Sequence, residues 1–171
     1  MDLPLHPFVV HLPLALAVLL PPAAGAVLWY SRRRPDPVSL WRIAVLLHLL
    51  LALSAWSAVE TGESDEEAVE AVVPEAALET HEERAEVFLV LVWCAAAIAT
   101  AGLLSGPAGS LARHASGALT LIVAIVALGV GHSGGELVYR YGAARVHTST
   151  LSEEGAIDLP SHRRDHDDDD D

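Results

Sequence analysis

The sequence predicts an all-α integral membrane protein, a bundle of four transmembrane helices in up-down-up-down order. Of its 171 residues, 52% are hydrophobic, and the mean hydropathy is +0.38. The formal net charge is nevertheless −13, because the acidic residues crowd into 60–86 and 167–171 and leave long stretches without charge. Four of these stretches approach or exceed the roughly 20 apolar residues that a helix needs to cross a bilayer.

The first apolar stretch covers residues 8–30 and predicts the first membrane helix. Its arginines follow it at 32–34 instead of preceding it, so the stretch does not fit a cleaved signal peptide. Pro13, Pro21 and Pro22 lack a backbone N–H, and we expect the helix to bend where they remove its hydrogen bonds.

Three further helices are predicted at about 40–59, 75–104 and 115–138. The second contains His48 near its middle, which we interpret as a satisfied core histidine, with a second ligand site as the alternative. The acidic segment from Glu60 to Pro74 is expected to form a turn-rich loop. The third helix has two candidate starts, at Glu75 or at a capping box that begins at Thr80.

One transmembrane domain, residues 1–145, therefore precedes a tail, residues 146–171, that is expected to be acidic and disordered. Cys94 has no second cysteine with which to form a disulfide or a zinc-finger framework. The chain contains no H-E-x-x-H, no G-x-S-x-G, no phosphate-binding glycine loop and no C-x-x-C-H. These absences favour a protein that is not an enzyme, and we expect the lipid bilayer, but no nucleic acid, as a partner.

The arginines predict the orientation. The connection between the first two helices contains Arg32, Arg33, Arg34 and Arg42, and the connection between the last two contains Arg113. By the positive-inside rule, both short connections are cytoplasmic, and both termini and the acidic segment lie outside a bacterial cytoplasmic membrane. Two arginines beyond the fourth helix, at 140 and 145, oppose this assignment.

This topology brings four histidines to the outer membrane face: His6, His11, His81 and His132. All four are candidate metal ligands. Solvation or helix capping is the simpler interpretation of His6 and His81, whereas His11 enters the apolar stretch, where an imidazole needs a partner.

His132 lies in the stretch Gly129 to Tyr139, which ends the fourth helix. Glu136 follows His132 by four residues, so the carboxylate shares its helical face and would fix the orientation of the imidazole. Gly131, Gly134 and Gly135 remove side chains there and predict close packing against another helix or a flat ligand.

Four segments carry a resemblance to a known family. They are His6-Pro7-Phe8-Val9-Val10-His11-Leu12-Pro13-Leu14-Ala15-Leu16, Thr61-Gly62, His81, and residues 131–142. The sequence resembles, over about residues 4–145, a family of uncharacterised bacterial four-helix integral-membrane proteins catalogued as a domain of unknown function. Such families occur alongside cytochrome-like proteins, so the resemblance implies a haem or redox role.

Three functions from different classes compete. The first is b-type haem binding for electron transfer or redox sensing with a redox protein as partner, in which His11, His81, His132 and Glu136 hold the cofactor. The second is metal or proton handling by the same histidines with Glu60 and Glu136. The third is a scaffold without cofactor. We rank haem first, and expect His11 and His132 to meet and at least one of them to bind a haem iron or a transition metal.

Overall fold

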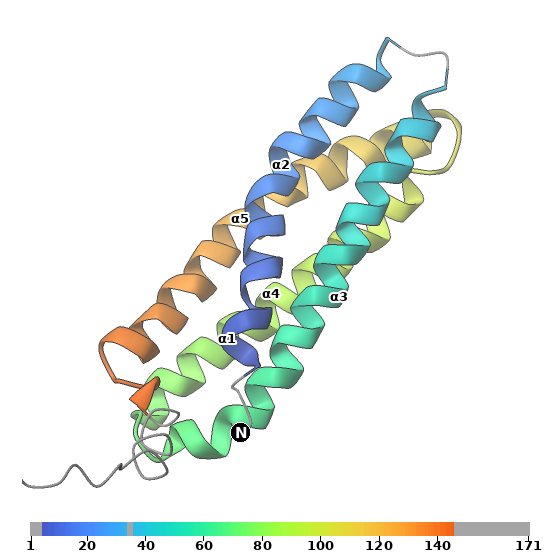
Figure 1. The fold of residues 1–171 in the computed structure, drawn as a ribbon. Coiled ribbons are helices and arrows are strands. Elements are labelled where there is room, and N and C mark those ends of the chain that lie inside the picture. Colours follow the sequence, from blue (N-terminus) through green and yellow to red (C-terminus); the bar gives the residue numbers. More distant parts are fainter. Residues whose placement is uncertain (1–4, 34–35, 146–171) are drawn as a thin grey trace, which may run out of the picture.

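The structure, a computed structural model, describes residues 5–33 and 36–145 (Figure 1). Within these ranges every regular element is a helix: α1 (His6–Val9), α2 (His11–Ser31), α3 (Pro37–Glu70), α4 (Glu75–Ala101) and α5 (Gly106–Tyr139). The short connections α2–α3 and α4–α5 lie at one end of the bundle, and α1, the α3–α4 turn and the end of α5 lie at the other (Figure 1). The predicted all-α, up-down-up-down bundle is confirmed.

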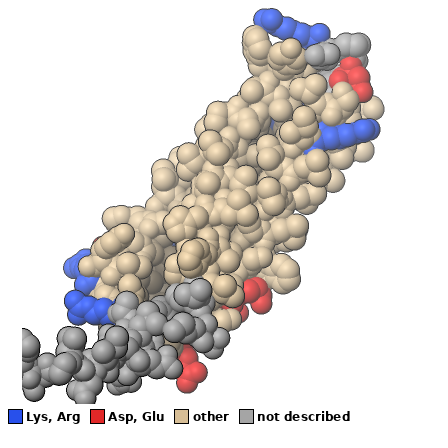
Figure 2. Space-filling model, viewed as in Figure 1, with Lys and Arg blue, Asp and Glu red and all other residues tan. Residues whose placement is uncertain are grey.

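Four helical segments are long and apolar enough to cross a membrane: His6–Ser31, Val38–Glu70, Glu75–Ala101 and Gly106–Tyr139. Large apolar side chains such as Leu19, Leu46, Val90 and Ile125 are exposed on them. A water-soluble bundle would bury such side chains, whereas a lipid environment accommodates them. Figure 2 shows the charged side chains at the two ends of the molecule, with an uncharged stretch between them.

α3 and α5 are too long for the bilayer alone. Each has 34 residues, about 50 Å of helix against a hydrocarbon core of about 30 Å. The apolar residues 8–30, 40–59, 87–104 and 115–131 are the parts suited to cross it. Residues 60–86 and 132–145 lie beyond, and we call this region the acidic cap. It has its own apolar cluster, Val73, Leu78, Leu137 and Ala143.

The acidic cap differs from the loop expected after residue 59. α3 continues as a helix to Glu70, and only residues 71–74 separate it from α4. The physical reason is that five of the eleven residues from 60 to 70 are glutamate, a good helix former, and most of the acidic side chains there are exposed to water. α5 also begins earlier than expected, at Gly106 instead of about residue 115. The acidic tail predicted at 146–171 lies outside the described residues.

The opposite end of the bundle is closed by two buried side chains. The Trp41 indole Nε1–H donates to the Ala99 carbonyl over 2.8 Å. The Arg113 guanidinium, 7% exposed, donates to the carbonyls of Gly102 and Leu104 at the end of α4. A buried arginine that caps a helix in this way satisfies carbonyls that otherwise have no partner. Arg113 therefore serves the α4–α5 connection and does not add a surface charge.

His48 is a satisfied core histidine. Its Nδ1–H donates to the Ala44 carbonyl over 2.7 Å, and because a carbonyl only accepts, Nε2 must accept from the Ser116 hydroxyl at 2.9 Å. In α3, α4 and α5 the residues of the main apolar cluster, among them Leu51, Phe88 and Val123, lie between this pair and the acidic cap. A packed apolar core therefore separates the two polar regions.

Candidate functional site

A cavity of about 600 Å³ opens in the acidic cap between α1, α3, α4 and α5. It lies where the chain leaves the apolar segments, at the end of the bundle that holds α1 (Figure 1). Its polar lining consists of two imidazoles and five carboxylates: His6, His81, Glu63, Asp65, Glu66, Glu82 and Glu86. Its apolar lining includes Val59, Val69, Leu78, Leu137 and Val138.

His6 begins α1, which the single residue Val10 separates from α2. The interruption comes one turn before Pro13, which has no N–H to donate to the Val9 carbonyl. The His6 Nδ1 lies 2.9 Å from the Ala58 carbonyl oxygen and 3.4 Å from Thr61 Oγ1. Since the carbonyl only accepts, Nδ1 carries a proton, and in the neutral ring Nε2 is the nitrogen with the lone pair.

His81 is anchored in the same way from α4. Its Nδ1 lies 2.9 Å from Ser133 Oγ on α5. The Ser133 hydroxyl proton is directed at its own helix, with carbonyl oxygens at 3.2 Å (Gly129) and 3.0 Å (Val130). Ser133 therefore accepts from the His81 Nδ1–H, and Nε2 again keeps its lone pair. Burial lowers the pKa of His81, and repulsion by Arg84, and by His6 when that ring is protonated, lowers it further, so the neutral His81 ring is favoured.

Each imidazole rests on a glycine. A Cβ added at Gly62 would lie 3.1 Å from Cε1 of His6, and a Cβ added at Gly134 would lie 3.1 Å from Cε1 of His81. The absence of a side chain lets both rings approach the helix backbone. Of the other glycines expected to pack closely, Gly131 makes ordinary contact with Leu14, and Gly135 has no atom within 4 Å of an added Cβ.

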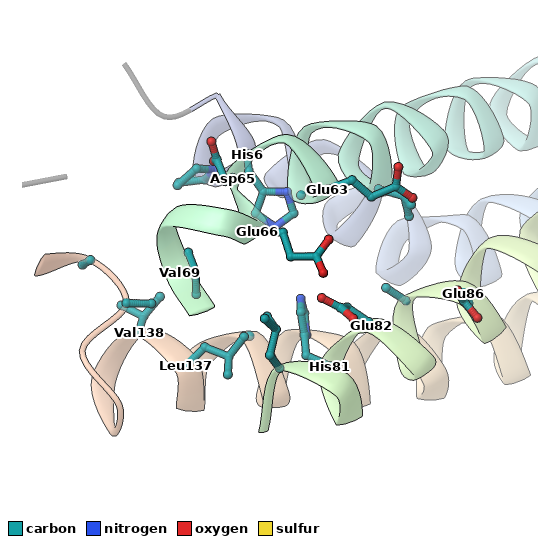
Figure 3. Close-up of a pocket in the computed structure, with 18 residues that line it drawn as sticks. His6, Glu63, Asp65, Glu66, Val69, His81, Glu82, Glu86, Leu137 and Val138 are labelled. Atoms are coloured by element: carbon teal, nitrogen blue, oxygen red, sulfur yellow. The ribbon is translucent and has the colours of Figure 1, made fainter. Parts of the chain in front are cut away.

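The carboxylates make the cavity strongly negative. Figure 3 shows Glu66 and Glu82 extending into the space between His6 and His81. Burial raises the pKa of Glu82, and the charges of nearby glutamates raise it further: Glu66, Glu70, Glu86 and Glu79. Crowded carboxylates of this kind are stabilised by a bound cation.

The cavity could take up a cation only after small side-chain movements. Among the described residues, no three His, Cys, Asp or Glu side chains are grouped closely enough to hold a metal ion as they stand. Glu66 and Glu82 have long side chains on the cavity wall. Rotation of either side chain about its own bonds can carry its carboxylate toward the imidazoles without moving the backbone.

His11 and His132 lie elsewhere. Both side chains are exposed, and neither lines the cavity. Glu136 forms an ion pair with Arg140, with 3.4 Å between Oε1 and Nη1, and in the described part of the chain no hydrogen bond joins it to His132. The structure thus brings together His6 and His81, the two of the four candidate histidines for which the sequence favoured solvation or helix capping.

Sequence reasoning missed two residues: Ser133, which is the hydrogen-bond partner of His81, and Glu66 on the cavity wall. Ser133 is adjacent to His132, but the step of about 100° per residue turns it inward and leaves His132 exposed. The helical spacing of four residues between Ser133 and Leu137 could have indicated this, because it puts both residues on the same buried face of α5. Glu66 lies in an acidic run whose members differ only in their position around the helix.

Comparison with protein families gives one finding. Residues 2–148 match the family described as "Predicted membrane protein (DUF2231)". Comparison with curated proteins and with solved structures gives no match.

Proposed function

The chain belongs to the DUF2231 family of predicted membrane proteins, and on that premise we propose that it binds a divalent transition-metal ion in the acidic cap through Nε2 of His6 and of His81. One observation carries the proposal: two imidazoles line the same cavity, and the hydrogen-bond partner that holds each of them lies at Nδ1. Metal-binding histidines are held in this way, because a hydrogen bond at one ring nitrogen fixes the tautomer that presents the other.

The donor atoms favour one class of metal. Imidazole nitrogen suits Zn²⁺, Cu²⁺, Ni²⁺ and Fe²⁺, whereas Ca²⁺ and Mg²⁺ prefer sites made of oxygen. Glu66 and Glu82 are the carboxylates placed between the two rings (Figure 3), and they would complete a four-coordinate set of two nitrogens and two oxygens. Their negative charge also compensates that of the ion.

Binding of b-type haem, the function ranked first from the sequence, is the second candidate. The cavity volume of about 600 Å³ lies within the roughly 300–1,000 Å³ of small-molecule sites, and His6 and His81 could serve as axial ligands. Electrostatic repulsion disfavours haem binding here, because haem would bring two negatively charged propionates into a cavity that already holds five carboxylates. A haem held instead by His11 or His132 would lie outside the cavity.

Transport along the bundle has less support. The apolar cluster that includes Leu51, Phe88 and Val123 separates the cavity from His48 and Ser116. The buried polar side chains in this stretch, Ser54 and Thr120, both donate to carbonyls of their own helices. A proton or ion would therefore have to cross the core without a titratable side chain among the described buried residues there. We therefore propose a site that holds its ion at the membrane surface, as in metal binding or sensing.

A metal titration tests the proposed function. Protein purified in mild detergent and stripped of metal should bind one Co²⁺ per chain, with visible absorption bands from the nitrogen ligands. Zn²⁺ should displace Co²⁺, and excess Mg²⁺ or Ca²⁺ should not. A Soret shift on adding haem, with no Co²⁺ bound, would select the haem alternative. No response to either would favour the scaffold function.

We also propose that the acidic cap lies outside a cytoplasmic membrane. The arginines at the opposite end include Arg32, Arg33 and Arg42, and Arg140 in the cap is paired with Glu136, which weakens the argument against this orientation. Reporter fusions after Arg33 and after Tyr141 should report the cytoplasm and the outside, respectively. Reporters in the same compartment would contradict the topology, and the reverse result would place the cavity in the cytoplasm.

A further inference from the structure

We infer that Ser133 is a positioning residue for the metal site, because its hydroxyl sets the tautomer and direction of the His81 imidazole. This inference rests on the proposed function. Ser133 touches no ion itself and acts through the ring it holds. Ser133 lines a second cavity of about 280 Å³ together with Thr80, Arg84 and Glu136, and it contacts His81, which lines the main cavity.

The hydrogen-bond balance at Ser133 leaves one role for its oxygen. The side chain is 4% exposed, and its single proton points to the carbonyls of Gly129 and Val130. Its lone pairs face His81 Nδ1 at 2.9 Å. An oxygen that already donates to a carbonyl can only accept from the ring, so it holds the proton on Nδ1 and directs Nε2 to the cavity.

Neighbouring residues make this contact specific. Gly134, the residue after Ser133, has no side chain, and the His81 ring lies in the space that this leaves. A Cβ added at Gly134 would lie 3.1 Å from Cε1 of His81. His6 is held differently, since its closest acceptor is the backbone carbonyl of Ala58, which no substitution removes. Ser133 is therefore the side chain through which the tautomer of a proposed ligand can be changed while both imidazoles are kept.

The expected effect is moderate. Loss of a partner that orients a metal-bound histidine lowers metal affinity about 10- to 100-fold. The Val130 backbone, which raises the pKa of His81 and so favours a protonated ring nitrogen, remains when Ser133 is replaced. We therefore expect the lower end of that range, about tenfold, for Ser133→Ala.

The experiment compares the wild type with Ser133→Ala and Ser133→Thr in detergent. The ¹⁵N resonances of the metal-free His81 ring report its tautomer, which a purely structural role would not change, and a Co²⁺ titration reports affinity. The wild type and Ser133→Thr should show Nδ1–H and equal affinity, whereas Ser133→Ala should show mixed tautomers and about tenfold weaker binding. Ser57→Ala is the matched control, because the Ser57 hydroxyl donates only to its own helix, at Leu53.

The outcomes separate this inference from the proposed function. A Ser133→Ala protein with the wild-type tautomer and affinity would overturn the role of Ser133 while leaving the metal site intact. A wild type that shows the Nδ1–H tautomer, loses it in Ser133→Ala and binds no Co²⁺ would overturn the proposed function instead. If Ser133→Ala fails to fold, Ser133→Cys supplies a weaker acceptor of similar size, and the same two readouts decide.

Discussion

His81→Ala should lose Co²⁺ binding by more than about 100-fold, since removal of a ligand exceeds the 10- to 100-fold cost of removing the partner that orients one. His6→Ala should show a similar loss, because the two rings present Nε2 to the same cavity. The measurement is a Co²⁺ titration by visible absorption, repeated with Zn²⁺ competition. Each single variant keeps the other imidazole, so residual weak binding in either is compatible with the proposed site.

His11→Ala and His132→Ala are the matched controls. Both histidines come from the same end of the bundle, but their side chains are exposed and outside the cavity. They should keep the affinity of the wild type. Loss of Co²⁺ binding in His132→Ala, with full binding in His81→Ala, would contradict the cavity site. That result would favour the pairing of His11 with His132 that the sequence suggested.

Metal binding should also raise the unfolding temperature of the wild type, because an ion that binds only the folded state stabilises it. The gain is about 2.7 kcal/mol at a free ion concentration 100 times the Kd. The same ion concentration should leave the unfolding temperature of the His6→Ala, His81→Ala double variant unchanged. An equal shift in that variant would mean that the ion binds elsewhere, for instance in the tail outside the described residues.

Gly109→Ala should destabilise the bundle by about 3 kcal/mol or more, at or above the upper end for overpacked interiors. A Cβ at Gly109 would overlap the backbone carbonyl of Leu104 and lie 3.3 Å from Nη1 of Arg113. The clash is with backbone, so rotation of a side chain cannot relieve it. The backbone at Leu104 would have to move to make room for the new Cβ. Its carbonyl would then move away from the Arg113 guanidinium that caps the end of α4.

Thermal unfolding in detergent, followed by circular dichroism, measures this effect. Gly129→Ala is the control in the same helix, because no atom lies within 4 Å of an added Cβ there. It should be neutral or stabilising by up to about 1 kcal/mol, since alanine favours a helix over glycine. Equal unfolding temperatures for the two variants would show that the α4–α5 turn tolerates a side chain at Gly109.

The sequence by itself determined the membrane class, the four long helices and their alternating direction. These properties depend on local composition: an apolar stretch of sufficient length crosses the bilayer wherever its neighbours lie, and a short connection makes consecutive helices antiparallel. It also indicated that histidines gather at one end, because their distances from the helix ends can be counted. The interpretation of His48 as a satisfied core residue agrees with its two hydrogen bonds.

The tertiary structure decided which of those histidines share a cavity. His11 and His132 lie at the expected level but are exposed, whereas His6 and His81 face each other across the cavity (Figure 3). That difference arises from the rotation of each helix about its axis, which is set by packing against all its neighbours and not by any one local pattern. The same packing turned Ser133 inward and, with α3 helical to Glu70, placed Glu66 beside the two imidazoles.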